Sequence, residues 1–256
     1  MRIIRYVLGD GDPQYGWVLE DRVGPLDGSP FSDFQRKEAT IALTDVRLLP
    51  PVVPQKIICV GRNYAAHAEE HGAEVPEVPL LFLKPPSAVI APQEDIVLPP
   101  QSSQIEHEAE LAVIIGKRGR WISAERAADF ILGYTIANDV TARDLQQRDG
   151  QWTRGKGFDT FCPLGPWIQT DFDPTDKMLT CHVNGQMRQM ASTHEMVFTV
   201  PQLIAFASSI MTLLPGDTLL TGTPSGVGPL NPGDVVEIAI EDLGSLVNPV
   251  VAQSSR

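Results

Sequence analysis

The sequence is poor in cysteine and contains no long apolar run. Its three cysteines, Cys59, Cys162 and Cys181, show no Cys-x-x-Cys spacing, so neither a disulfide framework nor a thiolate zinc site is indicated. No stretch reaches the roughly 18 consecutive apolar residues typical of a membrane-spanning helix, and residues 1–10 are too brief a run for a signal peptide. We therefore expect a soluble, cytoplasmic protein.

Cations are also scarce. The chain has 20 Lys and Arg against 32 Asp and Glu, which gives a formal net charge of -12. Such a field repels polyphosphate chains and anionic membrane surfaces, so neither nucleic acid nor a membrane is expected as a partner. The glycine patterns of P-loops and dinucleotide-binding folds are missing as well. Residues 56–170 hold 11 of the cations, and a small acidic ligand is expected there.

The composition is that of a globular protein. With 43% hydrophobic and 20% charged residues, 256 residues suffice for one main domain and a smaller one. Alternating apolar residues at 3–8, 15–20 and 22–26, separated by turn signals, predict a small N-terminal β domain over residues 1–51. The Pro-rich stretch 48–54 predicts a linker, and residues 52–256 form the second predicted domain.

The second domain is expected to be rich in strands. Apolar patterns predict strands at 56–60, 105–115, 131–138 and 218–220, and Asn184-Gly185 predicts a hairpin between 179–183 and 186–190. Helices are predicted at 63–72, 123–130, 141–148 and 199–213, with Thr141 and Asp144 approximating a capping box. His71 is expected to be solvated. Together these elements predict an α+β or mainly-β domain with antiparallel pairing.

Clustered carboxylates are the strongest chemical signal. If residues 105–115 form one strand, Glu106, Glu108 and Glu110 point to one face, where like charges call for a divalent cation. Asp139 follows a buried strand and enters a loop beside the core. Oxygen ligands without His or Cys favour Mg²⁺ or Mn²⁺. The alternatives are an exposed acidic strand end and, for Asp139, a helix cap.

A second signal is the pair formed by His67 and Glu70, three residues apart on a predicted helix face. A carboxylate can orient an imidazole and raise its basicity, as in general bases, although such pairs also occur as plain surface ion pairs. Lys156 lies between two glycines that let a ligand approach closely. Further candidates for anion binding are Arg62, Lys84, Arg143 and Arg154, and residues 221–228 form a glycine-rich loop.

Six motifs together resemble the fumarylacetoacetate hydrolase family and occur in that family's order. They are Cys59-Val-Gly-Arg-Asn-Tyr-Ala-Ala-His67, Phe82-Leu-Lys-Pro85, His107-Glu-Ala-Glu-Leu-Ala-Val113, Asn138-Asp-Val-Thr-Ala-Arg-Asp144, Trp152-Thr-Arg-Gly-Lys156 and Thr221-Gly-Thr-Pro224. The resemblance covers about residues 52–250. The preceding residues look like the small N-terminal domain that many members carry.

The resemblance implies a mixed β-sheet roll, usually dimeric, that holds Mg²⁺ or Mn²⁺. By the same resemblance Glu108, Glu110 and Asp139 match the metal ligands, whereas Glu106 lies outside the pattern. His67 and Glu70 match a dyad that activates water. Residues matching the substrate side are Gln146, Lys156 and Thr223, with Lys156 expected to meet developing negative charge, and weaker matches at Arg62, Asn63 and Tyr64.

The implied activity resembles that of an acylpyruvase or a fumarylpyruvate hydrolase of aromatic catabolism. We expect a homodimer that cleaves the C–C bond of a small anionic 2,4-dioxo acid through a pyruvate enolate stabilised by the metal. The same site could decarboxylate or tautomerise oxaloacetate, or isomerise or decarboxylate hydroxymuconate-type diacids. Two other classes stay open, namely a non-catalytic protein with a structural cation and a metal-free glycosidase with paired carboxylates.

Overall fold

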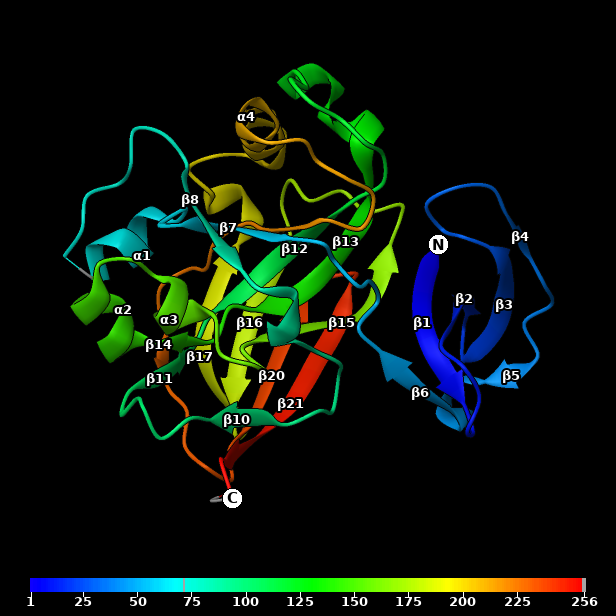
Figure 1. Ribbon diagram of the computed structural model, residues 1–256, viewed down its shortest axis with the longest axis horizontal. Coiled ribbons are helices and arrows are strands. Elements are labelled where there is room, and N and C mark those ends of the chain that lie inside the picture. Colours follow the sequence, from blue (N-terminus) through cyan, green and yellow to red (C-terminus); the bar gives the residue numbers. More distant parts are fainter. Residues whose placement is uncertain (71, 255–256) are drawn as a thin grey trace.

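The computed structural model describes residues 1–70 and 72–254 and has a β-rich α+β fold, as the sequence predicts (Figure 1). The predicted exposure of His71 and the last two residues of the predicted second domain lie outside the described residues. Within the described ranges, no helix combines the length and the apolar character that crossing a membrane requires.

The N-terminal strands form a group that lies to one side of the molecule in Figure 1. They are β1 (Arg2–Leu8), β2 (Gln14–Leu19), β3 (Arg22–Gly28), β4 (Phe34–Arg36), β5 (Ile41–Ala42) and β6 (Val46–Leu49), with a 3-10 turn η1 (Leu43–Asp45) before β6. The first three confirm the predicted strands. The predicted linker begins too early, because Leu48 and Leu49 belong to β6, which pairs with β1.

The largest sheet joins this group to the rest of the chain. Its other strands are β7 (Ile57–Gly61), β8 (Leu80–Lys84), β9 (Val89–Ile90), β12 (Ala109–Ile115), β13 (Ile131–Asn138), β15 (Cys162–Gln169) and β18 (Thr218–Leu220). The order along the sheet is β4-β3-β2-β1-β15-β13-β12-β18-β7-β8, with β9 paired to β15. Strand β12 therefore lies in the middle, between β13 and β18, and is buried along its whole length.

A second sheet has the order β10-β21-β20-β16-β17 and a small third one β14-β11-β19. Their strands are β10 (Ile96–Leu98), β11 (Ile105–His107), β14 (Thr141–Ala142), β16 (Met178–Val183), β17 (Gln186–Ser192), β19 (Gly228–Pro229), β20 (Val235–Ile240) and β21 (Gly244–Ala252). The predicted hairpin is confirmed: Asn184 and Gly185, with φ of 53° and 75°, connect β16 to β17. A two-residue turn with positive φ at both positions matches the twist of the strands.

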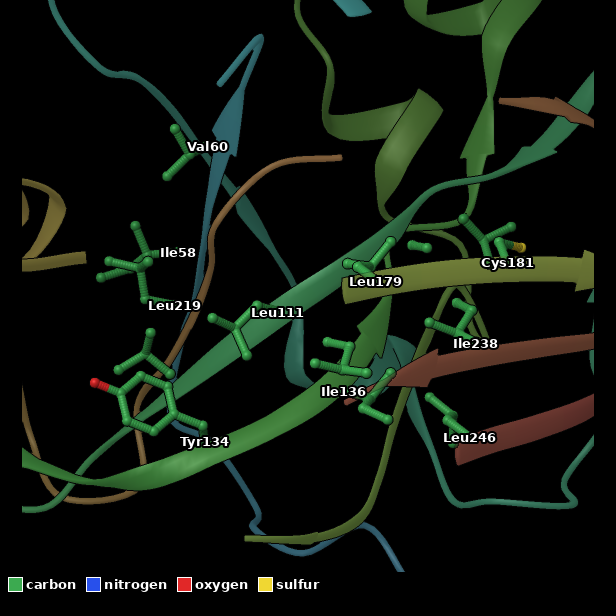
Figure 2. Close-up of a cluster of buried hydrophobic side chains, with 14 of the residues drawn as sticks. Ile58, Val60, Leu111, Tyr134, Ile136, Leu179, Cys181, Leu219, Ile238 and Leu246 are labelled. Carbon is green, nitrogen blue, oxygen red and sulfur yellow. The ribbon is translucent and has the colours of Figure 1, made fainter. Parts of the chain in front are cut away.

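The main core lies between the first two sheets (Figure 2). The large sheet contributes Leu111, Ile136 and Leu219, and the second sheet faces them with Leu179 and Ile238. On β12 the side chains alternate, so Ala112 and Ile114 enter a separate cluster on the other face of the large sheet. This central strand is held from both sides, which makes its end a rigid position for functional groups.

The helices are shorter than predicted. They are α1 (Ala65–Glu70), α2 (Arg143–Asp149), α3 (Thr153–Lys156) and α4 (Val200–Ile210), with 3-10 turns η2 (Pro86–Ala88), η3 (Ala124–Phe130) and η4 (Thr193–Glu195). The capping box predicted at Thr141 is wrong: Thr141 lies in β14, and Asp144 accepts hydrogen bonds from Ser102 and Ser103 instead. The helix predicted at 123–130 is instead the 3-10 turn η3, for which Ser123 is the N-cap.

The acidic segment 105–115 is two strands and not one. The break falls at Glu108, whose backbone N–H donates to the side chain of Asn138 at 3.0 Å. Before the break β11 pairs with β14 and β19, and after it β12 belongs to the large sheet. The break places Glu106 on β11 in the small third sheet and Glu110 on β12 in the large sheet, so the three glutamates do not lie along one continuous strand.

Candidate active site and metal centre

Glu108, Glu110 and Asp139 meet at the end of the β12–β13 ladder. The backbone N–H of Asp139 donates to the carbonyl of Glu108 at 2.9 Å, so these two residues face each other just beyond the paired strands. Glu110 lies on β12 and accepts a hydrogen bond from Gly222 N at 2.6 Å. One oxygen from each carboxylate lies within 4.8 Å of the others, and all three residues are buried.

Buried cations surround part of this acidic cluster. Lys156 Nζ donates to Glu108 Oε2 at 2.7 Å and to Asp139 Oδ2 at 2.6 Å. Lys84 Nζ donates to Asp139 Oδ1 at 2.5 Å, and Arg143 Nη2 to Glu108 Oε1 at 2.5 Å. These charge-assisted bonds fix the carboxylates of Glu108 and Asp139 in place. Both lysines were candidates for anion binding, and the anions that they contact here are the chain's own.

Within the cluster, the negative charge of Glu110 is the one that the cations described above do not pair with. Burial, followed by the negative charges of Asp139 and Glu108, raises the pKa of its carboxyl well above the ordinary value. Burial acts on Glu108 in the same direction, but Lys156 and Arg143 lower its pKa overall. Among the described residues Glu110 forms no ion pair. A hard divalent cation would satisfy these oxygens, so the donor set fits Mg²⁺ or Mn²⁺ held by the three carboxylates.

Glu106 lies outside this cluster. Its carboxylate accepts from Arg143 Nε at 2.7 Å and from Gln104 Nε2 at 2.6 Å. The prediction that it would join Glu108 and Glu110 on one strand face is wrong, because Glu106 lies on β11, before the strand break, and is not part of the three-carboxylate cluster. It shares that arginine with Glu108, so it helps to position Arg143 beside the cluster.

His67 and Glu70 lie together on α1. His67 Nδ1 is 3.5 Å from Glu70 Oε2, and the histidine side chain is 8% exposed. Glu70 also accepts from the backbone N–H of Gly226 at 3.1 and 3.2 Å. The carboxylate thus links α1 to the glycine-rich loop 221–228. This arrangement can orient the imidazole ring of His67, which is what a general base requires.

A cavity of about 270 Å³ is lined both by His67 of the pair on α1 and by Glu108 of the acidic cluster. Of the predicted site residues, those that line it are Arg62, His67, Glu108, Gln146, Lys156 and Thr223. Tyr64 is 2% exposed, packs in the main core and is not among the lining residues that the structure describes, so its part in substrate binding stays a prediction. In Figure 1 the helices α1, α2 and α3 gather on this side of the molecule.

Two aromatic residues of the cavity were not among the predicted site residues. Phe82 and Trp152 meet edge to face, with ring centroids 5.1 Å apart and planes at 71°. Lys156 Nζ lies 5.0 Å from the Phe82 ring centroid, close enough for a cation–π contact. Both residues belong to the motifs quoted above, but their pairing joins distant segments. Gly61 has no side chain for a reason: a Cβ there would come within 2.8 Å of the Trp152 ring.

Comparison with known proteins shows which family has a similar sequence. A family model described as "Fumarylacetoacetate (FAA) hydrolase C-terminal" matches residues 56–251, and one described as "Rv2993c-like, N-terminal" matches residues 1–51. The mitochondrial oxaloacetate tautomerase Fahd2a of Rattus norvegicus is 46% identical over 223 residues, which are 82% of this chain and 71% of the relative.

Solved structures with a similar fold cover nearly the whole chain. A 5-carboxymethyl-2-hydroxymuconate delta-isomerase from Mycobacterium smegmatis has 47% identity and a TM-score of 0.93, covering 99% of this chain and 100% of that one. A maleylpyruvate hydrolase from Sphingobium sp. SYK-6, in complex with manganese(II) ion and pyruvate, has 34% identity, a TM-score of 0.82 and coverage of 99% and 100%. These similar proteins bear the names of three different reactions.

Proposed function

The chain belongs to the fumarylacetoacetate hydrolase family, and from this premise we propose that it is a divalent-metal-dependent hydrolase. Its substrate class is the 2,4-dioxo acids of the acylpyruvate or fumarylpyruvate type, and the bond cleaved is the C–C bond next to the distal carbonyl. We also propose that it acts as a homodimer on this small anionic substrate, as the resemblance implies.

One observation carries the proposal. The same cavity is lined by His67, with Glu70 as its neighbour, and by Glu108 of the acidic cluster. A base held by a carboxylate beside a metal-binding cluster is the arrangement needed to activate water next to a polarised oxo acid. A structural cation site would need neither a cavity nor a base.

The reaction balances with one water molecule. R–CO–CH₂–CO–COO⁻ and H₂O give R–COO⁻, pyruvate and a proton. His67 accepts a proton from water while the water oxygen attacks the distal carbonyl. The C–C bond then breaks, its electron pair passes to the CH₂ carbon to give the pyruvate enolate, and that carbon takes up the proton held by His67. The new carboxylic acid releases the net proton.

Charge in the cavity suits an anionic substrate. The described residues of the buried cluster are the carboxylates Glu106, Glu108, Glu110 and Asp139 and the cations Lys84, Arg143 and Lys156. When all are ionised, a divalent ion brings this set to a net positive charge. The bound ion supplies Lewis-acid stabilisation of the developing enolate charge. Lys156, which lines the cavity, contributes further electrostatic stabilisation there.

Tautomerisation or decarboxylation of oxaloacetate is the second candidate. It is supported by the 46% identity to the rat oxaloacetate tautomerase. Tautomerisation moves a proton between carbon and the keto oxygen without addition of water, and His67 can carry that proton; loss of CO₂ leads to the same enolate, also without water. Isomerisation of a hydroxymuconate-type diacid uses the same proton transfer, as the name of the mycobacterial structure suggests.

A substrate panel with and without metal tests the proposal. We expect the protein to release pyruvate from acetylpyruvate and fumarylpyruvate in the presence of Mg²⁺ or Mn²⁺, and to lose this activity in EDTA until the ion is restored. In H₂¹⁸O, one ¹⁸O should enter the carboxylate product. Turnover of oxaloacetate or carboxymethyl-hydroxymuconate without acylpyruvate cleavage would assign the second candidate. Activity that survives complete chelation would contradict metal dependence.

Arg62 is expected to favour substrates with a distal carboxylate. It lines the cavity at φ 58°, and among the described residues its side chain forms no ion pair or hydrogen bond. A charge-assisted bond to a carboxylate is worth roughly a tenfold to hundredfold change in affinity. Arg62→Ala should therefore raise KM by that factor for fumarylpyruvate and much less for acetylpyruvate. An equal change for both substrates would contradict this role.

A further inference from the structure

Gln189 connects the acidic strand to the glycine-rich loop. It lies on β17, is 1% exposed, and has a neighbour at each hydrogen-bonding position of its amide. Oε1 accepts from Ala109 N at 3.1 Å and lies 3.0 Å from His107 Nδ1. Nε2 donates to Thr223 Oγ1 at 2.7 Å and to the Pro224 carbonyl at 2.8 Å.

The orientation of this amide is determined by backbone groups. The N–H of Ala109 can only donate, so it requires Oε1, and the carbonyl of Pro224 can only accept, so it requires Nε2. Flipping the amide would place two donors together at one end and two acceptors at the other. Nε2 of Gln189 is therefore the donor in the bond to Thr223, and the hydroxyl oxygen of Thr223 is the acceptor.

The direction of this bond decides what Thr223 can offer to a ligand. Because its oxygen accepts from Gln189, its own proton is available to another acceptor, and no such acceptor is found among the described residues. Thr223 lines the cavity. We propose that Gln189 is a positioning residue that makes the Thr223 hydroxyl a hydrogen-bond donor to an oxygen of the bound oxo acid, an inference that rests on the proposed function.

The same amide also sets the place of that donor. Ala109, which it holds, lies between Glu108 and Glu110 on the acidic segment. One side chain thus bonds both to the loop that carries Thr223 and to the segment that carries Glu108 and Glu110, two of the proposed metal ligands. The hydroxyl and the acidic cluster are therefore held at fixed positions relative to each other, which allows the hydroxyl and the proposed metal ion to contact one oxo acid at the same time.

Pyruvate binding at saturating Mn²⁺, measured by calorimetry, tests this role. Gln189→Glu keeps the shape but replaces the donor with an acceptor, so Thr223 turns its proton toward the new carboxylate and away from the ligand. We expect pyruvate affinity to fall on the order of tenfold to a hundredfold, the value of a lost hydrogen bond to a charged ligand. Thr223→Val should cause a similar loss, and Thr223→Ser, which keeps the hydroxyl, a smaller one.

Two comparisons separate this role from a general effect on folding. Gln186→Glu makes the same chemical change on the exposed part of β17 and should leave pyruvate affinity unchanged. In the Thr223→Val background, Gln189→Glu should cause no further loss, because its effect passes through the hydroxyl that is already absent. Thermal unfolding of each variant shows whether it is folded. If Gln189→Glu does not fold, Gln189→Met takes its place, with a smaller loss that also vanishes in that background.

The possible failures are distinct. A loss that is equally large in the Thr223→Val background, or unchanged affinity in Thr223→Val itself, overturns the inference while the wild-type protein still binds pyruvate. If the wild-type protein with Mn²⁺ binds neither pyruvate nor any substrate of the panel, the proposed function fails and the inference fails with it.

Discussion

We expect the His67→Ala variant to cleave acylpyruvates about 10²- to 10⁴-fold more slowly than the wild type, the usual contribution of a positioned general base. His67 lines the cavity and can accept a proton from water, and Glu70 lies 3.5 Å from its Nδ1. The carboxylates proposed to bind the metal are untouched by this change, so Mn²⁺ affinity should stay close to that of the wild type. Pyruvate release at saturating substrate and metal gives the rate.

A second histidine provides a matched control. His194 Nδ1 lies 3.4 Å from Asp176 Oδ1, a similar pair, but its side chain is 63% exposed. His194→Ala should leave the rate of cleavage unchanged. Glu70→Gln is expected to slow cleavage less than His67→Ala, because the ring loses its orienting charge and keeps a polar neighbour of the same size. Full acylpyruvate cleavage by His67→Ala would remove the dyad from the mechanism, and the second candidate would then need another base.

The parts of the fold that could be predicted from the sequence depend on local interactions. Alternating side chains located β1 to β3 and β13, and Asn184-Gly185 located the hairpin because its positive φ values are a property of those two residues. The break at Glu108 could not be located in this way. It depends on the side chain of Asn138, which is 30 residues away in the sequence and contacts the strand only in the folded sheet.

In the candidate site, too, local contacts could be predicted from the sequence and long-range contacts could not. Spacing within one segment brought His67 to Glu70 on α1. The partners of Lys84 and Arg143 could not be predicted, because they follow from the order in which β8, β11 and β13 pack around one point. The contact of Phe82 with Trp152 could not be predicted either, because neither segment contains a local signal for it. Contacts between distant segments depend on the topology of the fold, which the periodicity of a single sequence does not specify.

Glu110→Gln should separate metal binding from stability. Glu110 is buried beside two carboxylates, and among the described residues it forms no ion pair. Its one described hydrogen bond comes from Gly222 N, and a glutamine Oε1 can still accept that bond. The change removes a repelling charge and a proposed ligand at once. We expect Mn²⁺ affinity to fall at least about a hundredfold, since indirect partners of a ligand already contribute 10- to 100-fold, while the metal-free protein becomes more stable.

The direction of the stability change in Glu110→Gln follows from the pKa of Glu110. Because burial and its acidic neighbours raise that pKa in the folded protein, the unfolded chain loses the proton first, and folded stability is lost as pH rises above the ordinary value of 4.5. The gain from Glu110→Gln in metal-free protein should therefore grow with pH above that value and vanish below it. Urea unfolding of both proteins across this range, in EDTA, measures the effect.

Glu106→Gln is the matched comparison and should behave in the opposite way. Its carboxylate accepts from Arg143 Nε at 2.7 Å, so the variant weakens a buried ion pair and should lose about 1–3 kcal/mol of stability. Mn²⁺ affinity should change far less than in Glu110→Gln, because Glu106 lies outside the carboxylate cluster. If Glu110→Gln binds Mn²⁺ like the wild type, the cluster is not the metal centre. If both variants lose stability alike, the charge imbalance at Glu110 is compensated by another group, and the three carboxylates need no cation to coexist.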